Sequence, residues 1–147
     1  AVAAVLTNHV SAARTRQLEE RQAQQAHAEA VLAEDSVRLA LANSMMGIMK
    51  QFYGKGPIGA KAWVLDDYVF IAMEGGLTRN EETLLDDGKE DVVRSYRLSF
   101  QETMRDTMMG TVAEITGRRV LTYHSQIVFH PTRAFEIFLL EPRAPTG

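Results

Sequence analysis

The sequence contains no cysteine among its 147 residues. Disulfide bonds, thiolate metal ligands and cysteine nucleophiles are therefore excluded, and the absence is typical of proteins in a reducing compartment. Long hydrophobic runs are also missing. The longest dense ones, 68–73 and 135–140, have the length of a β-strand rather than the roughly 18 residues of a membrane span. We expect a cytoplasmic protein without a membrane-spanning helix.

An excess of positive charge is absent as well. Sixteen Lys and Arg residues stand against 19 Asp and Glu residues, which gives a formal net charge of -3. Nucleic-acid-binding proteins concentrate basic side chains, so we expect no nucleic-acid partner. The four histidines show no complete metal-binding or catalytic pattern, and we therefore expect no metal, no cofactor and no enzymatic activity.

Residues 1–34 lack glycine, proline and aromatic side chains and are rich in Ala, Gln, Glu and Arg, a composition that favours helix. Only Leu18 and Ala23 are apolar within residues 14–25, so no heptad seam is sustained. We interpret this segment as a helical or partly disordered arm that the core does not need, and a dimerising helix is the alternative. Its first residues lack the features of a secretory signal. Because the chain starts at Ala1, we expect its native N-terminus to lie upstream.

Apolar residues recur at helical spacing in two further segments, which predicts two amphipathic helices. The first helix ends at Gly54–Pro57 and the second at Gly117, because glycine and proline stop a helix there. Thr78 and Glu81 have the spacing of a capping box, which predicts a short helix before the second long one. The two apolar series are Val37, Leu41, Met45, Ile48 and Phe52, followed by Val93, Tyr96, Phe100, Met104, Met108, Val112 and Ile115.

Two pairs of β-prone runs predict two hairpins. The first pair covers 61–66 and 68–74, and the second covers 120–129 and 134–141, with turn residues between the members of each pair. The resulting order is α-β-β-α-β-β. It predicts a single α+β domain at 35–141, in which an antiparallel four-stranded sheet packs on helices. The helical arm at 1–34 precedes this domain, and a proline-containing tail at 142–147 follows it.

Several phrases along the predicted domain resemble the MpsC family. They are GKGP at 54–57, AWVLDDYVFIAMEGGLTRNEETLL at 62–85, RLSF at 97–100 and TGRRVLTYHSQI at 116–127. The resemblance spans about Asp35 to Leu140 and leaves the N-terminal arm outside. The family is named for a Na+-translocating, membrane-potential-generating system of some bacteria, whose membrane components also serve in inorganic carbon uptake. The resemblance implies a cytoplasmic accessory protein that works with membrane transport components.

Five cationic residues are candidates for binding an anion or another small ligand. They are Lys55, Arg94, Arg97, Arg118 and Arg119. Lys55 lies in a glycine-rich turn, whose backbone amides could face an anion, but the spacing of a Walker loop is absent and a helix-ending turn is the alternative. The arginines have an ordinary alternative too, because they can pair with acidic neighbours or complement the end of a helix.

Four apolar residues are candidates for a self-association surface. Met46, Met49 and Met109 lie beside the predicted apolar series, and Trp63 points to the opposite side of its strand from its two neighbours. Methionine suits an adaptable partner surface, and tryptophan is common at interfaces. We therefore predict a homodimer.

The combined expectation is a non-enzymatic accessory or regulatory protein of the MpsC type. It would act through self-association and through contacts with membrane transport components of a cation or inorganic-carbon system. The alternative is a small-molecule or anion-binding sensor that uses the arginine and lysine cluster. Saturable binding of a nucleotide or of bicarbonate would favour that alternative.

Overall fold

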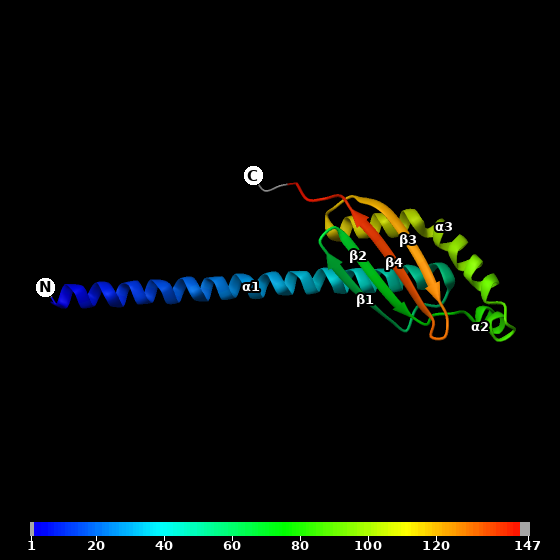
Figure 1. Ribbon diagram of the computed structural model, residues 1–147, viewed down its shortest axis with the longest axis horizontal. Helices are drawn as coiled ribbons and strands as arrows, with labels where there is room; N and C mark the ends of the chain where they lie inside the picture. The colour runs from blue at the N-terminus through cyan, green and yellow to red at the C-terminus, as the bar shows by residue number, and fades with distance from the viewer. Residues whose placement is uncertain (1, 145–147) are drawn as a thin grey trace. The chain divides into compact units, whose positions relative to one another are not determined.

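The computed structural model of the chain describes residues 2–144, apart from the side chain of Val2. In chain order the elements are α1 (Val2–Tyr53), β1 (Gly59–Leu65), β2 (Tyr68–Glu74), α2 (Arg79–Asp86), α3 (Glu90–Thr116), β3 (Val120–Val128) and β4 (Arg133–Leu140) (Figure 1). This order confirms the predicted α+β class, with α2 and α3 as the predicted helix pair. Of the predicted tail, residues 142–144 lie in neither helix nor strand, and 145–147, including Pro145, lie outside the described residues.

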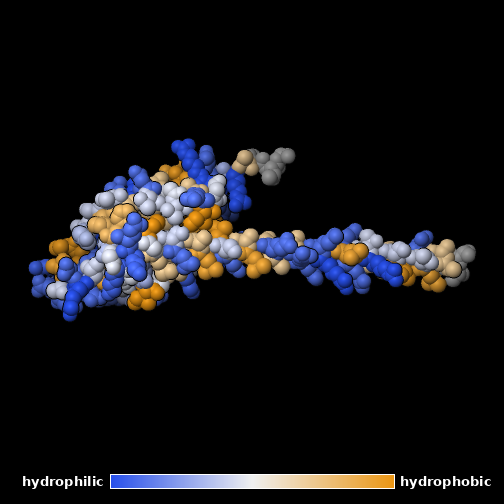
Figure 2. Space-filling view, turned by 180° about the vertical axis from the view of Figure 1, so that it is seen from behind, coloured by the Kyte–Doolittle hydropathy of each residue, from blue (hydrophilic) through white to orange (hydrophobic). Residues whose placement is uncertain are grey.

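The chain divides into two compact units, residues 1–36 and residues 37–147, and α1 contributes to both. In the first unit, every side chain from residue 3 to residue 34 is exposed. Its exposed apolar residues include Leu6, Leu18 and Leu32. Hydrophobic and hydrophilic groups alternate along this helix in Figure 2. A helix without a continuous apolar stripe has no face of its own to bury. This segment is helical, and its residues 3–34 contribute nothing to a hydrophobic core.

In the second unit, the four strands form one antiparallel sheet in the order β1-β2-β4-β3. The turn at Asp66–Asp67 closes the first hairpin, and Asp66 has a positive φ of 53° there, a conformation that Asp tolerates better than most residues. The two hairpins join through β2 and β4. The register places Trp63, Phe70 and Ile137 beside one another on neighbouring strands.

The ends of the helices follow the predicted signals. Thr78 and Glu81 form a capping box at the start of α2, in which each side chain bonds the other residue's backbone N–H. Gly54 and Gly117 follow α1 and α3 with φ values of 78° and 68°, which only glycine adopts without strain. Among the described residues, no helix combines the length and apolar character needed to cross a membrane.

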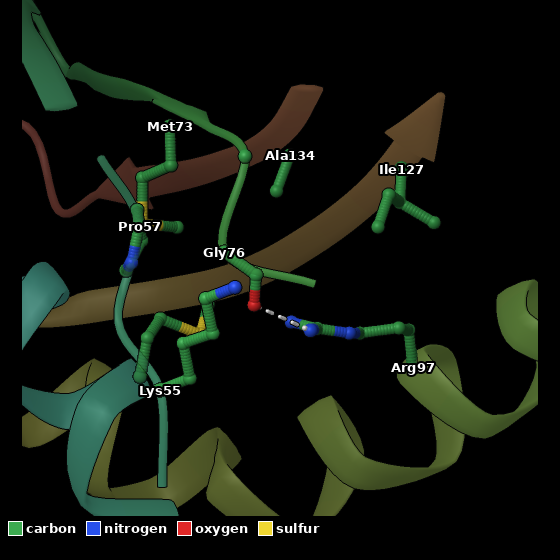
Figure 3. Close-up of a pocket in the computed structure, with 9 residues that line it drawn as sticks. Lys55, Pro57, Met73, Gly76, Arg97, Ile127 and Ala134 are labelled. Atoms are coloured by element: carbon green, nitrogen blue, oxygen red, sulfur yellow. Dashed lines mark hydrogen bonds between the residues drawn. The ribbon is translucent and has the colours of Figure 1, made fainter. Parts of the chain in front are cut away.

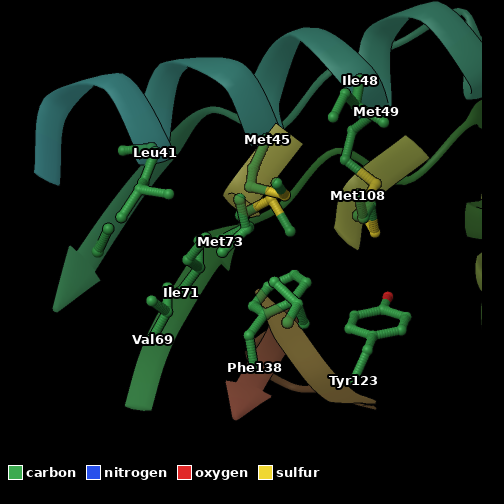
Figure 4. Close-up of a cluster of buried hydrophobic side chains, with 14 of the residues drawn as sticks. Leu41, Met45, Ile48, Met49, Val69, Ile71, Met73, Met108, Tyr123 and Phe138 are labelled. Carbon is green, nitrogen blue, oxygen red and sulfur yellow. The ribbon is translucent and has the colours of Figure 1, made fainter. Parts of the chain in front are cut away.

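The core of the second unit lies between one face of the sheet and two helices, α3 and the part of α1 from residue 37 onward (Figure 4). Met49 from α1 lies beside Met108 from α3, and Leu41 and Met45 from α1 lie above the inward side chains of the sheet. The inward side chains include Val69, Ile71, Met73, Tyr123 and Phe138. Burying each large apolar side chain contributes roughly 1.5–3 kcal/mol, so this layer holds the helices on the sheet.

The buried stripe of α3 differs from the predicted one. Tyr96 is 48% exposed, whereas the polar residues Arg97 and Gln101 are buried beside Val93 and Met104. The prediction placed aromatic residues in the core because they are more apolar. The structure instead buries two polar side chains, because each has a buried carboxylate partner in the same unit.

Candidate functional site

The face of the sheet that points away from α1 and α3 also carries apolar side chains. Strand β4 alternates between buried and half-buried residues, and the half-buried ones point away from α1 and α3. We call this the outer face. Its apolar residues are Trp63, Leu65, Tyr68, Phe70, Phe135, Ile137 and Leu139. Within residues 37–144, the helices that pack on the sheet lie on the opposite side, behind the strands in Figure 1.

The outer face presents a continuous row of aromatic rings. The ring centroids of Trp63 and Phe70 are 5.8 Å apart, and those of Phe70 and Phe135 are 5.9 Å apart. Trp63 is 40% exposed, Tyr68 is 56% exposed and Leu65 is 66% exposed. Single exposed apolar residues are common on proteins, but a contiguous group across three strands marks an interaction site.

Charged side chains on the outer face lie toward one end of the strands. Lys61 lies on β1, and Glu74 and Arg133 face each other across β2 and β4 with 3.8 Å between Oε1 and Nη2. The rows that contain Phe70 and Tyr68 carry no acidic or basic residue on β1, β2 or β4. An apolar centre with a polar margin is the usual composition of a protein–protein interface.

The four residues predicted to form a self-association surface do not share one surface. Trp63 lies on the outer face, as its strand position predicted. Met49 is 2% exposed and packs in the core, so its place in the predicted surface is wrong. Met46 is half-buried on α1, and Met109 is half-buried and packs against the core from α3. The reason is that the sheet stands between Trp63 and the helices that carry the methionines.

Arg97 is the most deeply buried of the predicted cationic residues. Its Nη2 donates to Glu81 Oε1 at 2.6 Å and to the Gly76 carbonyl oxygen at 3.1 Å, and its guanidinium lies 3.8 Å from the Tyr53 ring centre. Burial acts to raise the pKa of Glu81, but hydrogen bonds from Arg97 and Thr78 outweigh it and lower that pKa. Arg97 therefore forms a buried ion pair that ties α3 to α2.

Lys55 and Arg97 line the same small pocket (Figure 3). The pocket has a volume of about 10 Å³, which is room for about one water molecule. It lies beside Gly76, whose φ is 83° and where an added Cβ would come within 2.9 Å of Pro57 Cα. The close approach of these two backbone segments leaves no space inside the pocket for an anionic ligand.

Arg118 holds the turn of the first hairpin. It donates from Nη1 to the Asp66 carbonyl at 2.8 Å and from Nη2 to the Glu141 carbonyl at 2.9 Å, and it forms an ion pair with Asp67. Arg119 is exposed, and its carbonyl accepts the backbone N–H of Glu141. Arg118 is thus occupied in joining two loops.

The five cationic residues do not form one cluster. Asp67, which Arg118 contacts, precedes β2, whereas Gly76, which Arg97 contacts, follows it. The seven residues of β2 separate these ends by roughly 23 Å. Arg94 pairs on the surface of α3 with Glu90 at 2.7 Å and with Asp91 at 3.2 Å. The five residues are therefore too far apart to form one anion-binding site.

A buried polar cluster that the sequence analysis missed centres on Glu136, whose side chain is fully buried. The carboxylate accepts hydrogen bonds from Tyr123 Oη at 2.5 Å, Ser125 Oγ at 3.0 Å and Gln101 Nε2 at 3.3 Å. Burial raises the pKa of Glu136 from 4.5 to about 7, against hydrogen bonds from Tyr123 and Ser125 and the charge of Arg97. Burial, together with the neighbouring Glu136, also raises the pKa of Tyr123. Glu136 therefore exchanges its proton near neutral pH.

This cluster borders a cleft of about 320 Å³ between α3 and β3. Gln101, Tyr123 and Ser125 line the cleft, so three of the four residues of the cluster reach it. At its rim, Arg105 pairs with Glu102 at 3.8 Å, and its guanidinium lies 5.6 Å from the Tyr123 ring centre. Among the described residues, no group of three or more His, Asp or Glu side chains could hold a metal ion.

One signal in the sequence could have identified Glu136. It is the single charged residue among positions 134, 136, 138 and 140, which share one face of β4 and are otherwise apolar. A charge in that register predicts a buried carboxylate with partners. Gln101 and Ser125 carry no comparable signal, because their meeting depends on how α3 lies across β3 and β4.

Comparison with known proteins gives one match. The sequence model of the family described as "Na+-translocating membrane potential-generating system (MpsC)" matches residues 34–142. The match contains both hairpins, the outer face and the Glu136 cluster. No curated protein and no solved structure matches the chain.

Proposed function

Because the chain belongs to the MpsC family of the Na+-translocating membrane potential-generating system, we propose that it is a non-enzymatic accessory protein that works as a homodimer. The outer face of the sheet is the dimer interface. The observation that carries this proposal is the contiguous apolar surface across β1, β2 and β4, with charged residues toward one end. The dimer works in the cytoplasm beside the membrane-bound transport components of the system.

The size of the outer face supports a second copy as its occupant. Four strands about 4.8 Å apart and about seven residues long cover roughly 20 Å by 23 Å. Two such faces placed together bury on the order of 1,000 Å², which is about the minimum for a specific protein–protein interface and fits a weak dimer that forms with rising concentration. Sheets also pack face to face in many proteins, about 10 Å apart, with their side chains interdigitating.

The composition of the face supports the same occupant. Trp63, Phe70 and Phe135 supply the aromatic side chains that dominate binding energy at interfaces. The charged residues Lys61, Glu74 and Arg133 lie toward one end of the strands, away from the Trp63–Phe70 row. The alternative function, an anion sensor built on the arginine and lysine cluster, has less support because those residues lie at opposite ends of β2.

The experiment is the solution mass of the full chain across a dilution series, measured by light scattering. We expect a dimer for the unmodified chain and at least a 100-fold weaker dimer for Trp63→Asp, because a carboxylate would be buried without a partner. Val92→Asp is the matched control, since Val92 is 52% exposed on α3 and lies off the outer face. Met46→Glu should also remain dimeric.

A monomeric unmodified chain at all concentrations would contradict the homodimer. A dimer that survives Trp63→Asp but is lost in Met46→Glu would move the interface from the sheet to the helices. If the chain is monomeric and Trp63→Asp abolishes its binding to the membrane components, the outer face holds a different protein.

A further inference from the structure

The Glu136 cluster joins a helix to two strands. Gln101 lies on α3, Tyr123 and Ser125 lie on β3, and Glu136 lies on β4. Tyr123 Oη contacts Glu136 Oε2, and Ser125 Oγ and Gln101 Nε2 both contact Glu136 Oε1. Ser125 Oγ also contacts Gln101 Oε1. Because Gln101 is the member on α3, its contacts hold the helix to the sheet at this point.

An ionised Glu136 leaves one of these contacts without a hydrogen atom. Ser125 Oγ faces one oxygen of Glu136 and one oxygen of Gln101, and it has a single hydrogen to donate. If the Gln101 amide turns by 180°, its nitrogen can donate to Ser125. Its oxygen then faces Glu136 Oε1 at 3.3 Å. In either orientation of the amide, two acceptor oxygens meet with no hydrogen between them.

One proton on Glu136 Oε1 removes this conflict. With the Gln101 amide as the structure has it, Glu136 Oε1 donates to Ser125 Oγ, and Ser125 donates to Gln101 Oε1. With the amide turned, the same proton is donated to the Gln101 oxygen instead. Every contact in the cluster then contains one hydrogen. The observed arrangement therefore fits a protonated Glu136.

We propose that the Glu136 cluster is a pH-sensitive contact between α3 and β3, in which loss of the Glu136 proton separates Gln101 from Ser125 and widens the cleft beside them. A fully buried carboxylate is costly when its partners are neutral and one contact lacks a hydrogen. Gln101, Tyr123 and Ser125 line the cleft of about 320 Å³, so its water is close at hand to hydrate the carboxylate once the contact opens. The inference goes beyond the proposed function, because the cluster lies on the helix side of the sheet and needs no dimer.

The groups around Glu136 leave it as the one that changes charge inside the cluster. The titratable and charged groups that face it are Tyr123 from β3, Arg97 from α3 and Tyr53 from α1, and its neighbour on β2 is apolar. Burial raises the pKa of both tyrosines, so they stay neutral, and arginine stays charged. The pKa of Glu136 is raised to about 7. Beyond the cluster, the cleft is also lined by the charged or titratable residues Glu102, Arg105 and His124.

The test is backbone hydrogen exchange of the full chain at pH 5.5 and pH 8, with each rate divided by that of an unstructured peptide at the same pH. Protection of residues 98–105 and 122–126 should fall on the order of 10-fold at pH 8, because the open form holds the proton less tightly. Strand β1, at the opposite edge of the sheet, should keep its protection.

Two variants assign the effect to a residue. Glu136→Gln is neutral at both pH values and should keep the same protection at both. Histidine also changes charge in this range, so His124→Gln, in the wall of the cleft, is the matched control and should show the full fall. Equal protection of the unmodified chain at the two pH values, or a fall that persists in Glu136→Gln, would overturn the proposal. Loss of the fall in His124→Gln would assign the effect to the histidine.

A second measurement uses the unmodified chain and does not depend on the folding of Glu136→Gln. The 13C NMR signal of the Glu136 carboxyl should titrate with a midpoint near pH 7, and the amide signals of Gln101 and Ser125 should shift with the same midpoint. A carboxyl midpoint near the ordinary value of 4.5, or amide signals that do not follow it, would contradict the pH-sensitive contact. Solution mass measures the dimer separately, so either proposal can fail alone.

Discussion

At the scale of single residues, the buried acidic side chains of this protein have opposite settings. Glu81 has Arg97 as a direct partner, and its pKa is lowered. Glu136 has only neutral hydrogen-bond partners, and burial raises its pKa to about 7. The direct cation favours the ionised form of Glu81, whereas burial favours the protonated form of Glu136.

The titration of Glu136 predicts how stability depends on pH. Between pH 4.5 and about 7 the folded chain holds a proton on Glu136 that the unfolded chain has released. The free energy of unfolding should therefore fall as pH rises through this window, by about 3 kcal/mol from this group. Urea unfolding in choline chloride at pH 5 and pH 8 measures the change. Glu136→Gln should flatten the dependence, and an unchanged slope in that variant would assign the effect to another group.

The Arg97–Glu81 pair predicts a non-additive effect of substitution. Arg97→Met leaves the buried Glu81 carboxylate without its cation and should lower the free energy of unfolding by about 3–5 kcal/mol. Adding Glu81→Gln to Arg97→Met should recover much of that loss, because no unpaired charge then remains. The measurement is urea unfolding of the two single variants and the double variant. If the losses simply add, the pair is not energetically coupled.

At the scale of elements, we predict that the core of the second unit folds without the N-terminal segment of α1. Its side chains from residue 3 to residue 34 are exposed, and the core of the second unit uses α1 only from residue 37. Removing residues 1–36 should therefore change the thermal unfolding midpoint by less than roughly 3 °C. The helical circular dichroism signal should fall with the lost turns. A midpoint lower by 10 °C or more would mean that the segment supports the core.

Elements and their ends could be predicted from the sequence because their signals are local. The Thr78–Glu81 capping box, the stop at Gly54 and the alternation along β4 each lie within a few residues, and the structure has all three. The buried stripe of α3 could not be predicted in the same way. Arg97 and Gln101 enter the core because of partners 16 and 35 residues away in the chain, which no local pattern reports.

At the scale of the whole molecule, the second unit has a different surface on each side of one sheet. The helices cover the side that contains Glu136, and the outer face carries Trp63 and its aromatic neighbours. Sequence reasoning placed Trp63 on a surface, because alternation on a strand is a local rule. It could not separate Trp63 from Met46 and Met49, because that separation depends on which face of the sheet α1 covers.

The proposed homodimer requires the outer faces of two copies to meet. The chain has no cysteine, so a single introduced one reports on its own position. Ile137 lies near the middle of the outer face, between Phe70 on β2 and His124 on β3, so Ile137→Cys is the test variant. Val92→Cys, at an exposed position of α3, is the control. Sheets packed face to face lie about 10 Å apart, so a bis-maleimide linker of about that length should convert Ile137→Cys to a covalent dimer and leave Val92→Cys monomeric. Equal, or no, crosslinking at the two positions would contradict a dimer formed through the sheet.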